Sequence, residues 1–108
     1  QMGHVGGPNR TTYCSTKFAL EGFTKSLAIE LAPNGIRVNS ICPTFIKTPM
    51  TEPFLKDKDF KNQVLSMIPL GRLGEVEDLM GPFVFLASDA SSMMTGSSVL
   101  VDGGWTSR

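Results

Sequence analysis

The sequence lacks a net charge, since 10 Lys and Arg residues balance 10 Asp and Glu residues in a chain of 108. Without surplus positive charge, it is not held to nucleic acid or an anionic membrane by bulk charge. Long apolar stretches are lacking too, because the longest uncharged run covers only Ala90–Val101. A membrane-crossing helix needs roughly 20 apolar residues. We therefore expect neither a nucleic-acid partner nor a membrane partner.

Cysteine and histidine are scarce. Cys14 and Cys42 are too few for a disulfide framework, and we interpret them as small apolar residues in a reducing compartment, which favours a cytoplasmic protein. The one histidine, His4, has no acidic or cysteine partner at metal-ligand spacing. We expect it to be a loop residue and expect no metal site. No secretory leader pattern follows Gln1.

What is present predicts alternating helices and strands. The stretch Tyr13–Ala32 has no proline and carries apolar residues on several faces, which predicts a helix buried on several sides. Thr11 or Thr12 could cap its start, and Pro33-Asn34-Gly35 should end it. The β-branched run Ile36–Ile41 then predicts a strand that stops at Pro43. A helix, a tight turn and a strand form half of a βαβ unit, so we expect the α/β class.

Residues 44–74 contain three prolines together with scattered charged and apolar residues, and we expect them to be irregular. Because their apolar content argues against disorder, we interpret them as a substrate lid, with Met50, Phe54, Leu55 and Met67 either in the lid or in the core. A second helix is predicted over Glu75–Ser88, and Pro82 should kink it. A second strand is predicted over Ser97–Val101, ending at Asp102-Gly103-Gly104.

Tyr13 and Lys17 are the residues that point to chemistry. Their four-residue spacing places both on one face of the predicted helix. Tyrosine has a reference pKa near 10, and a neighbouring ammonium favours its ionised form. The pair is therefore a plausible general acid-base unit for a substrate hydroxyl or carbonyl. Taken alone the spacing is weak, because a lysine that simply lies along a tyrosine gives the same pattern.

The surrounding residues resemble the short-chain dehydrogenase/reductase family. The blocks that match follow in the family's order and cover nearly the whole chain: Tyr13–Phe23, Leu31–Ile41, Cys42-Pro43, Thr48-Pro49, Pro69–Asp78, Phe85–Ser91, Thr95-Gly96 and Val101–Gly104. The final block is similar to the classical branch, near the ketoacyl-carrier-protein reductases and sugar dehydrogenases. The resemblance implies the C-terminal part of a Rossmann-type doubly wound parallel sheet.

The resemblance also implies roles for five residues. Tyr13 would be the acid-base group in an oxidoreductase that uses NAD or NADP on a small alcohol or ketone. Lys17 would assist Tyr13 and hold the nicotinamide ribose. Pro43 would lie beneath the nicotinamide, the backbone of Ile46 would contact its carboxamide, and the Thr48 hydroxyl would reach the carboxamide or the pyrophosphate.

The sequence departs from the family in two respects. Thr44 stands where members usually have glycine after the proline, so it could alter the nicotinamide pocket or point away. Gly3, Gly6 and Gly7 follow no strand and precede the wrong helix, so they are not the dinucleotide-binding loop. The family's catalytic serine, counted back from Tyr13, falls one position before Gln1. We therefore expect residues 1–108 to be the C-terminal portion of a single NAD(P)-binding domain that lacks its nucleotide-binding half and is inactive alone.

Two functions remain open from the sequence. The first is the oxidoreductase, whose full-length form should be a homodimer or homotetramer because the family resemblance implies helix contacts between subunits. The second is a non-catalytic pseudoenzyme or interaction module that docks on full-length subunits through apolar surface. The sequence assigns no particular substrate, reaction direction or preference between NAD and NADP.

Overall fold

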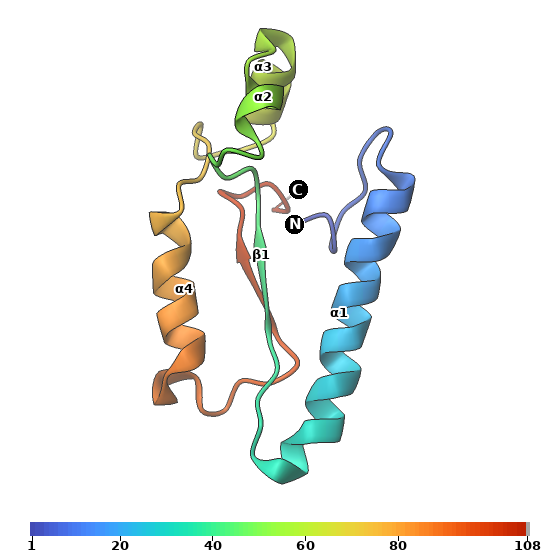
Figure 1. The fold of residues 1–108 in the computed structure, drawn as a ribbon, viewed down its shortest axis with the longest axis vertical. Coiled ribbons are helices and arrows are strands. Elements are labelled where there is room, and N and C mark those ends of the chain that lie inside the picture. The colour runs from blue at the N-terminus through green and yellow to red at the C-terminus, as the bar shows by residue number, and fades with distance from the viewer. Residues whose placement is uncertain (108) are drawn as a thin grey trace.

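The computed structural model describes residues 1–107 and contains a parallel two-stranded sheet with a long helix on either side (Figure 1). In chain order the elements are α1 (Thr11–Leu31), η1 (Ala32–Asn34), β1 (Ser40–Pro43), α2 (Glu52–Leu55), α3 (Lys58–Ser66), α4 (Glu77–Ala87), η2 (Asp89–Ser91) and β2 (Ser98–Val101). The strands pair in register from Ser40 opposite Ser98 to Pro43 opposite Val101. The predicted α/β class is confirmed. No helix within residues 1–107 has the length and apolar character needed to cross a membrane.

The first helix starts earlier than the sequence predicts. Its N-cap is Arg10, without a capping side chain, and Thr11 is already helical, so the expectation of a threonine cap was wrong. The Thr11 carbonyl instead accepts a hydrogen bond from the Ser15 hydroxyl at 2.9 Å. The predicted end is confirmed, because Gly35 adopts the left-handed conformation with φ of 73°.

The strand predicted over Ile36–Ile41 begins only at Ser40. The residues before it use side-chain hydrogen bonds instead of a strand ladder. The Asn39 side chain donates to the Met94 carbonyl at 2.9 Å and accepts from the Ser97 backbone at 3.0 Å. The Arg37 guanidinium donates to the Leu86 carbonyl at 2.7 Å. These bonds fix the approach to β1 against the end of α4 and the segment that follows it.

Residues 44–74 are more regular than predicted, since they contain α2 and α3. A capping residue that the sequence analysis overlooked explains α3: the Asp57 carboxylate accepts from the backbone N–H groups of Asp59 and Phe60 at 2.9 and 3.1 Å. The second long helix forms as predicted, within the expected bounds, and runs through Pro82.

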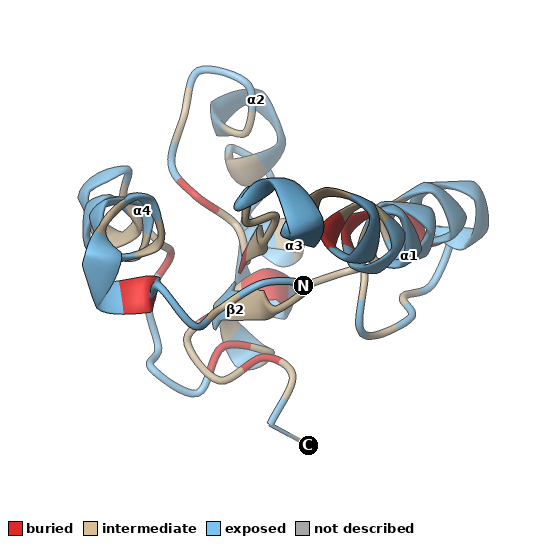
Figure 2. Ribbon diagram, turned by 90° about the horizontal axis from the view of Figure 1, so that it is seen from below, coloured by how far each residue is buried: buried red, intermediate tan, exposed pale blue. Residues whose placement is uncertain are grey.

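The core lies beneath α3, where α3 meets the C-terminal turn. Its buried members are Val64, Ile68, Leu73 and Trp105. The Phe45 ring packs on Trp105 with 5.9 Å between centroids. Leu55 and Met67, which the sequence left between lid and core, pack against this cluster. The distribution of burial is uneven, because most of α1 and α4 is exposed (Figure 2).

Asp102 ends β2 as a buried hydrogen-bond acceptor. Its carboxylate accepts from the Gly104 backbone at 2.9 Å and from the Thr106 backbone and hydroxyl at 2.8 and 2.7 Å. Burial raises the pKa of Asp102, but these hydrogen bonds outweigh it and hold the pKa below its usual value. The turn that follows the strand is thus stabilised by an ionised carboxylate.

Because of this turn, the free energy of unfolding should depend on pH. Because the pKa of Asp102 is lower in the folded state, its contribution is complete above the unfolded pKa of about 3.9 and is lost as the pH falls through the folded value. We expect Asp102→Asn to lower the free energy of unfolding by about 1–3 kcal/mol at neutral pH. The variant should lose less stability on acidification. Thermal unfolding of the full-length protein at several pH values tests this, with the exposed Asp89→Asn as control. Equal melting temperatures for wild type and Asp102→Asn would contradict it.

Candidate active site

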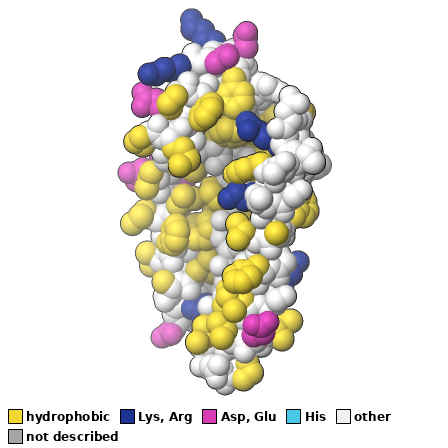
Figure 3. All heavy atoms as spheres, turned by 45° about the vertical axis from the view of Figure 1, so that its right-hand side comes forward, with side chains coloured by type: hydrophobic (Ala, Val, Ile, Leu, Met, Phe, Trp, Pro, Cys, Tyr) yellow, Lys and Arg dark blue, Asp and Glu magenta, His cyan; other side chains and the backbone are white. Residues whose placement is uncertain are grey.

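A cavity of about 470 Å³ opens beside the carboxyl end of β1. All five site residues predicted from the sequence line it, although they come from three segments of the chain. Tyr13 and Lys17 come from α1, Pro43 ends β1, and Ile46 and Thr48 follow in the loop. The lining is mostly apolar, and Figure 3 shows hydrophobic side chains over much of the face that it draws. The fold therefore gathers the predicted residues at one place.

Tyr13 and Lys17 lie one turn apart on α1, as their spacing predicts. The Lys17 ammonium nitrogen is 5.3 Å from the centroid of the Tyr13 ring. Tyr13 is 50% exposed, so its hydroxyl is accessible to a small molecule entering the cavity. The pair places a proton-carrying hydroxyl and a fixed positive charge side by side.

The loop after β1 is hydrogen-bonded to the segment just before α4. Ile46 is buried and forms an isolated parallel bridge with Gly74. The Gly74 N–H donates to the Phe45 carbonyl at 2.9 Å, and its carbonyl accepts from the Lys47 N–H at 2.8 Å. A Cβ at Gly74 would meet Cδ1 of Ile46, so a larger residue there would require the end of the Ile46 side chain to move. This bridge fixes where the Ile46 backbone lies.

The two threonines of the loop behave differently. Thr44, which stands at the family's glycine position, lines the cavity, and its hydroxyl accepts from the Gln1 side chain at 3.4 Å. The Thr48 hydroxyl is already engaged, since it lies 3.2 Å from the Thr51 hydroxyl and accepts from the Thr51 N–H at 3.3 Å. Thr44 thus changes the wall of the pocket, and Thr48 is oriented by its neighbour.

The sequence left four apolar residues, Met50, Phe54, Leu55 and Met67, open between lid and core. The structure puts two of them at the cavity and two at the core. Met50 and Phe54 line the cavity and are 81% and 64% exposed. Leu55 and Met67 belong to the packing around the core cluster. The parts of residues 44–74 that border the cavity are therefore the stretch from the end of β1 into α2 and, on α3, Phe60.

Glu21 is the residue of this site that the sequence analysis missed. It lies one further turn along the face of α1 that carries Tyr13 and Lys17, and it also lines the cavity. Its carboxylate accepts hydrogen bonds from Ser40 on β1 at 3.0 Å and from Ser98 on β2. Glu21 therefore ties α1 to both strands. The repeated four-residue spacing was a signal that could have revealed it.

The carboxylate of Glu21 has further partners besides Ser40 and Ser98. The Cys42 thiol donates to Oε1 at 3.4 Å, and Nε2 of His4 lies 3.7 Å from Oε2. Burial raises the pKa of Glu21, but hydrogen bonds from Ser98, Ser40 and Cys42 more than offset it, so the pKa lies below its usual value. Burial raises the pKa of the Cys42 thiol. His4 is a loop residue, as predicted, but the structure gives it acidic and cysteine neighbours that its spacing in the sequence did not reveal.

Comparison with known proteins gives one consistent result. The model of the family described as enoyl-(acyl carrier protein) reductase matches residues 1–106. L-xylulose reductase from Bos taurus is 48% identical over 105 residues, covering 97% of this chain and 43% of the relative. The 3-oxoacyl-(acyl-carrier-protein) reductase from Haemophilus influenzae is 45% identical over 103 residues, covering 95% and 42%.

A solved structure agrees with these relatives. Gluconate 5-dehydrogenase from Burkholderia cenocepacia, crystallised with NADP and tartrate, superposes with a TM-score of 0.94 at 33% identity. The match covers 99% of this chain and 42% of that chain. The chain thus spans about two fifths of the length of the proteins it matches.

Proposed function

The chain belongs to the classical short-chain dehydrogenase/reductase family, and its sheet is part of a Rossmann-type fold. We propose that the protein carrying it is an oxidoreductase that transfers a hydride between NAD(P)(H) and a secondary alcohol or ketone. One observation carries the proposal: Tyr13 and Lys17 face a cavity whose wall also includes Pro43, Ile46 and Thr48.

The residues present fit a nicotinamide cofactor. The cavity offers an apolar surface at Pro43 and Ile46, suited to a flat ring, next to the Lys17 ammonium and the Thr48 hydroxyl, suited to ribose and amide groups. A bound nicotinamide would supply the redox chemistry. The Tyr13 hydroxyl would give a proton to, or take one from, the substrate oxygen. Lys17 would hold the ribose and keep a positive charge beside Tyr13.

Residues 1–108 act, in this proposal, as the C-terminal portion of one NAD(P)-binding domain that does not turn over by itself. Support comes from the share of each relative that the chain spans, about two fifths. The segment around Met50 and Phe54 would cover bound substrate, since both side chains border the cavity. The free thiols of Cys14 and Cys42 favour a reducing, cytoplasmic setting.

Self-association is part of the proposal. Phe18, Phe23 and Ile29 on α1 are 49%, 61% and 77% exposed, which is costly for a helix surface left in water. A second copy covering these apolar side chains would give a homodimer or homotetramer. The same exposed side chains favour the second candidate, a non-catalytic module that docks on full-length subunits.

An activity screen separates the two candidates. The full-length protein would be mixed with NADH or NADPH and with L-xylulose, a 3-oxoacyl thioester or a keto-gluconate, and cofactor absorbance would be followed. We expect turnover that depends on both cofactor and substrate, with the reaction lacking substrate as control. If the protein bound cofactor but turned over none of these substrates, the proposed substrate class would be wrong. If it showed no cofactor binding and no turnover, the docking module would be favoured.

A further inference from the structure

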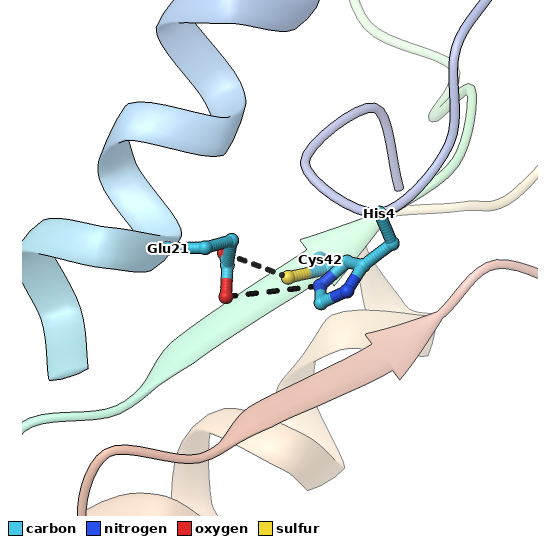
Figure 4. A group of neighbouring side chains, drawn as sticks. All are labelled: His4, Glu21 and Cys42. Atoms are coloured by element: carbon cyan, nitrogen blue, oxygen red, sulfur yellow. Dashed lines mark hydrogen bonds and ion pairs between the residues drawn. The ribbon is translucent and has the colours of Figure 1, made fainter.

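His4, Glu21 and Cys42 come from a loop, a helix and a strand, and their side chains converge at one point (Figure 4). Their nitrogen, oxygen and sulfur atoms all lie within 4.8 Å of one another. The cluster is about two helical turns from Tyr13, or about 12 Å along the axis of α1. Nothing in the proposed reaction uses His4 or the Cys42 thiol.

The donor set is that of a transition-metal site. Imidazole nitrogen, thiolate sulfur and carboxylate oxygen are the ligands that Zn²⁺ takes in proteins, and three of them with an open fourth position form a common arrangement. We propose that His4, Glu21 and Cys42 bind one divalent transition-metal ion of the Zn²⁺ type. This inference stands independently of the proposed oxidoreductase activity.

The surroundings of Glu21 support the proposal. Ser40 and Ser98 donate hydrogen bonds to its Oε2, which orients the carboxylate as outer partners orient metal ligands in known sites. Within residues 1–107, Oε1 accepts a hydrogen bond from the Cys42 thiol alone. The Glu21 side chain is 13% exposed and the His4 side chain 30% exposed, so His4 gives the ion a way in from solvent.

Binding would release one proton and would change no oxidation state. The Cys42 thiol would release to solvent the proton that it donates to Glu21, and its sulfur would give an electron pair to the metal. A ring nitrogen of His4 and an oxygen of Glu21 would give the other two pairs, and water would fill the fourth position. The loop carrying His4 would then be linked to α1 and β1 by metal–ligand bonds.

Cobalt(II) tests the site directly because cobalt bound to a thiolate absorbs light through charge transfer. The full-length protein, freed of metal, would be titrated with CoCl₂ alone and then with ZnCl₂. We expect a charge-transfer band that saturates at one cobalt per chain and disappears as zinc replaces it. Cys42→Ser should abolish the band, and His4→Asn should weaken the apparent affinity by at least about tenfold.

Matched variants keep the outcome clear. Cys14→Ser removes the other buried thiol of the chain and should leave the band unchanged. Tyr13→Phe should also leave it unchanged, so failure of the enzyme proposal cannot be mistaken for failure of this one. Circular dichroism checks that each variant is folded. If Cys42→Ser does not fold, His4→Asn, at an exposed position, tests the site in its place. Absence of the band in wild type, its survival in a folded Cys42→Ser variant, or an unchanged cobalt affinity in His4→Asn would overturn the metal site.

Discussion

Replacing Tyr13 by Phe in the full-length protein is expected to lower turnover by about 10²–10⁴-fold, the usual contribution of a positioned acid-base group. Only the hydroxyl is removed, so the ring should keep its place beside the Lys17 ammonium, 5.3 Å from the ring centroid. Cofactor binding should therefore be nearly unchanged. Steady-state rates and cofactor titration by fluorescence measure the two quantities separately.

Lys17→Ala provides the contrast. Because Lys17 is proposed to hold the cofactor as well as to assist Tyr13, this variant should weaken cofactor binding and also lower the rate. Thr12→Val removes an exposed hydroxyl next to Tyr13 and serves as the matched control. Near-normal turnover in Tyr13→Phe, with the control unaffected, would show that another group moves the proton.

The side of α1 that carries Tyr13 and Lys17 could be predicted because its signal is local. Tyr13 and Lys17 are four residues apart in one helix, so helix geometry alone places them together. Pro43, Ile46 and Thr48 had to be taken from the family resemblance, because nothing local says that the loop after β1 folds toward α1. The structure brings all five to one cavity, and their individual roles stay proposals.

The features that were missed depend on contacts distant in sequence or on competing local bonds. The cluster of His4, Glu21 and Cys42 joins three segments, and no spacing rule in one segment reveals it. Helix α3 was missed because prolines suggested irregular chain, although Asp57 supplies a capping carboxylate. A threonine cap was expected for α1, but Thr11 enters the helix itself.

The exposed apolar surface has a direct consequence for the 108-residue chain expressed alone. None of the described residues of α4 is buried, and Met80, Phe83 and Val84 on this helix are 57%, 58% and 63% exposed. Within residues 1–107, β1 and β2 pair only with each other, so each has a free edge. Free strand edges and apolar patches both favour association between chains, and a two-stranded sheet is marginal by itself.

We therefore expect the isolated chain to aggregate or to unfold without a cooperative transition, and to show neither dehydrogenase activity nor tight NAD(P)H binding. Phosphate groups are usually held by backbone N–H groups at a glycine-rich loop between a strand and a helix, and residues 1–107 contain no such strand before Gly3, Gly6 and Gly7. Sedimentation velocity, thermal circular dichroism and cofactor titration test this against the full-length protein. Replacing Phe23 and Ile29 by Ser should reduce association without restoring cooperative melting, because the free strand edges remain. A monodisperse monomer that melts cooperatively would contradict the prediction and favour the small docking module.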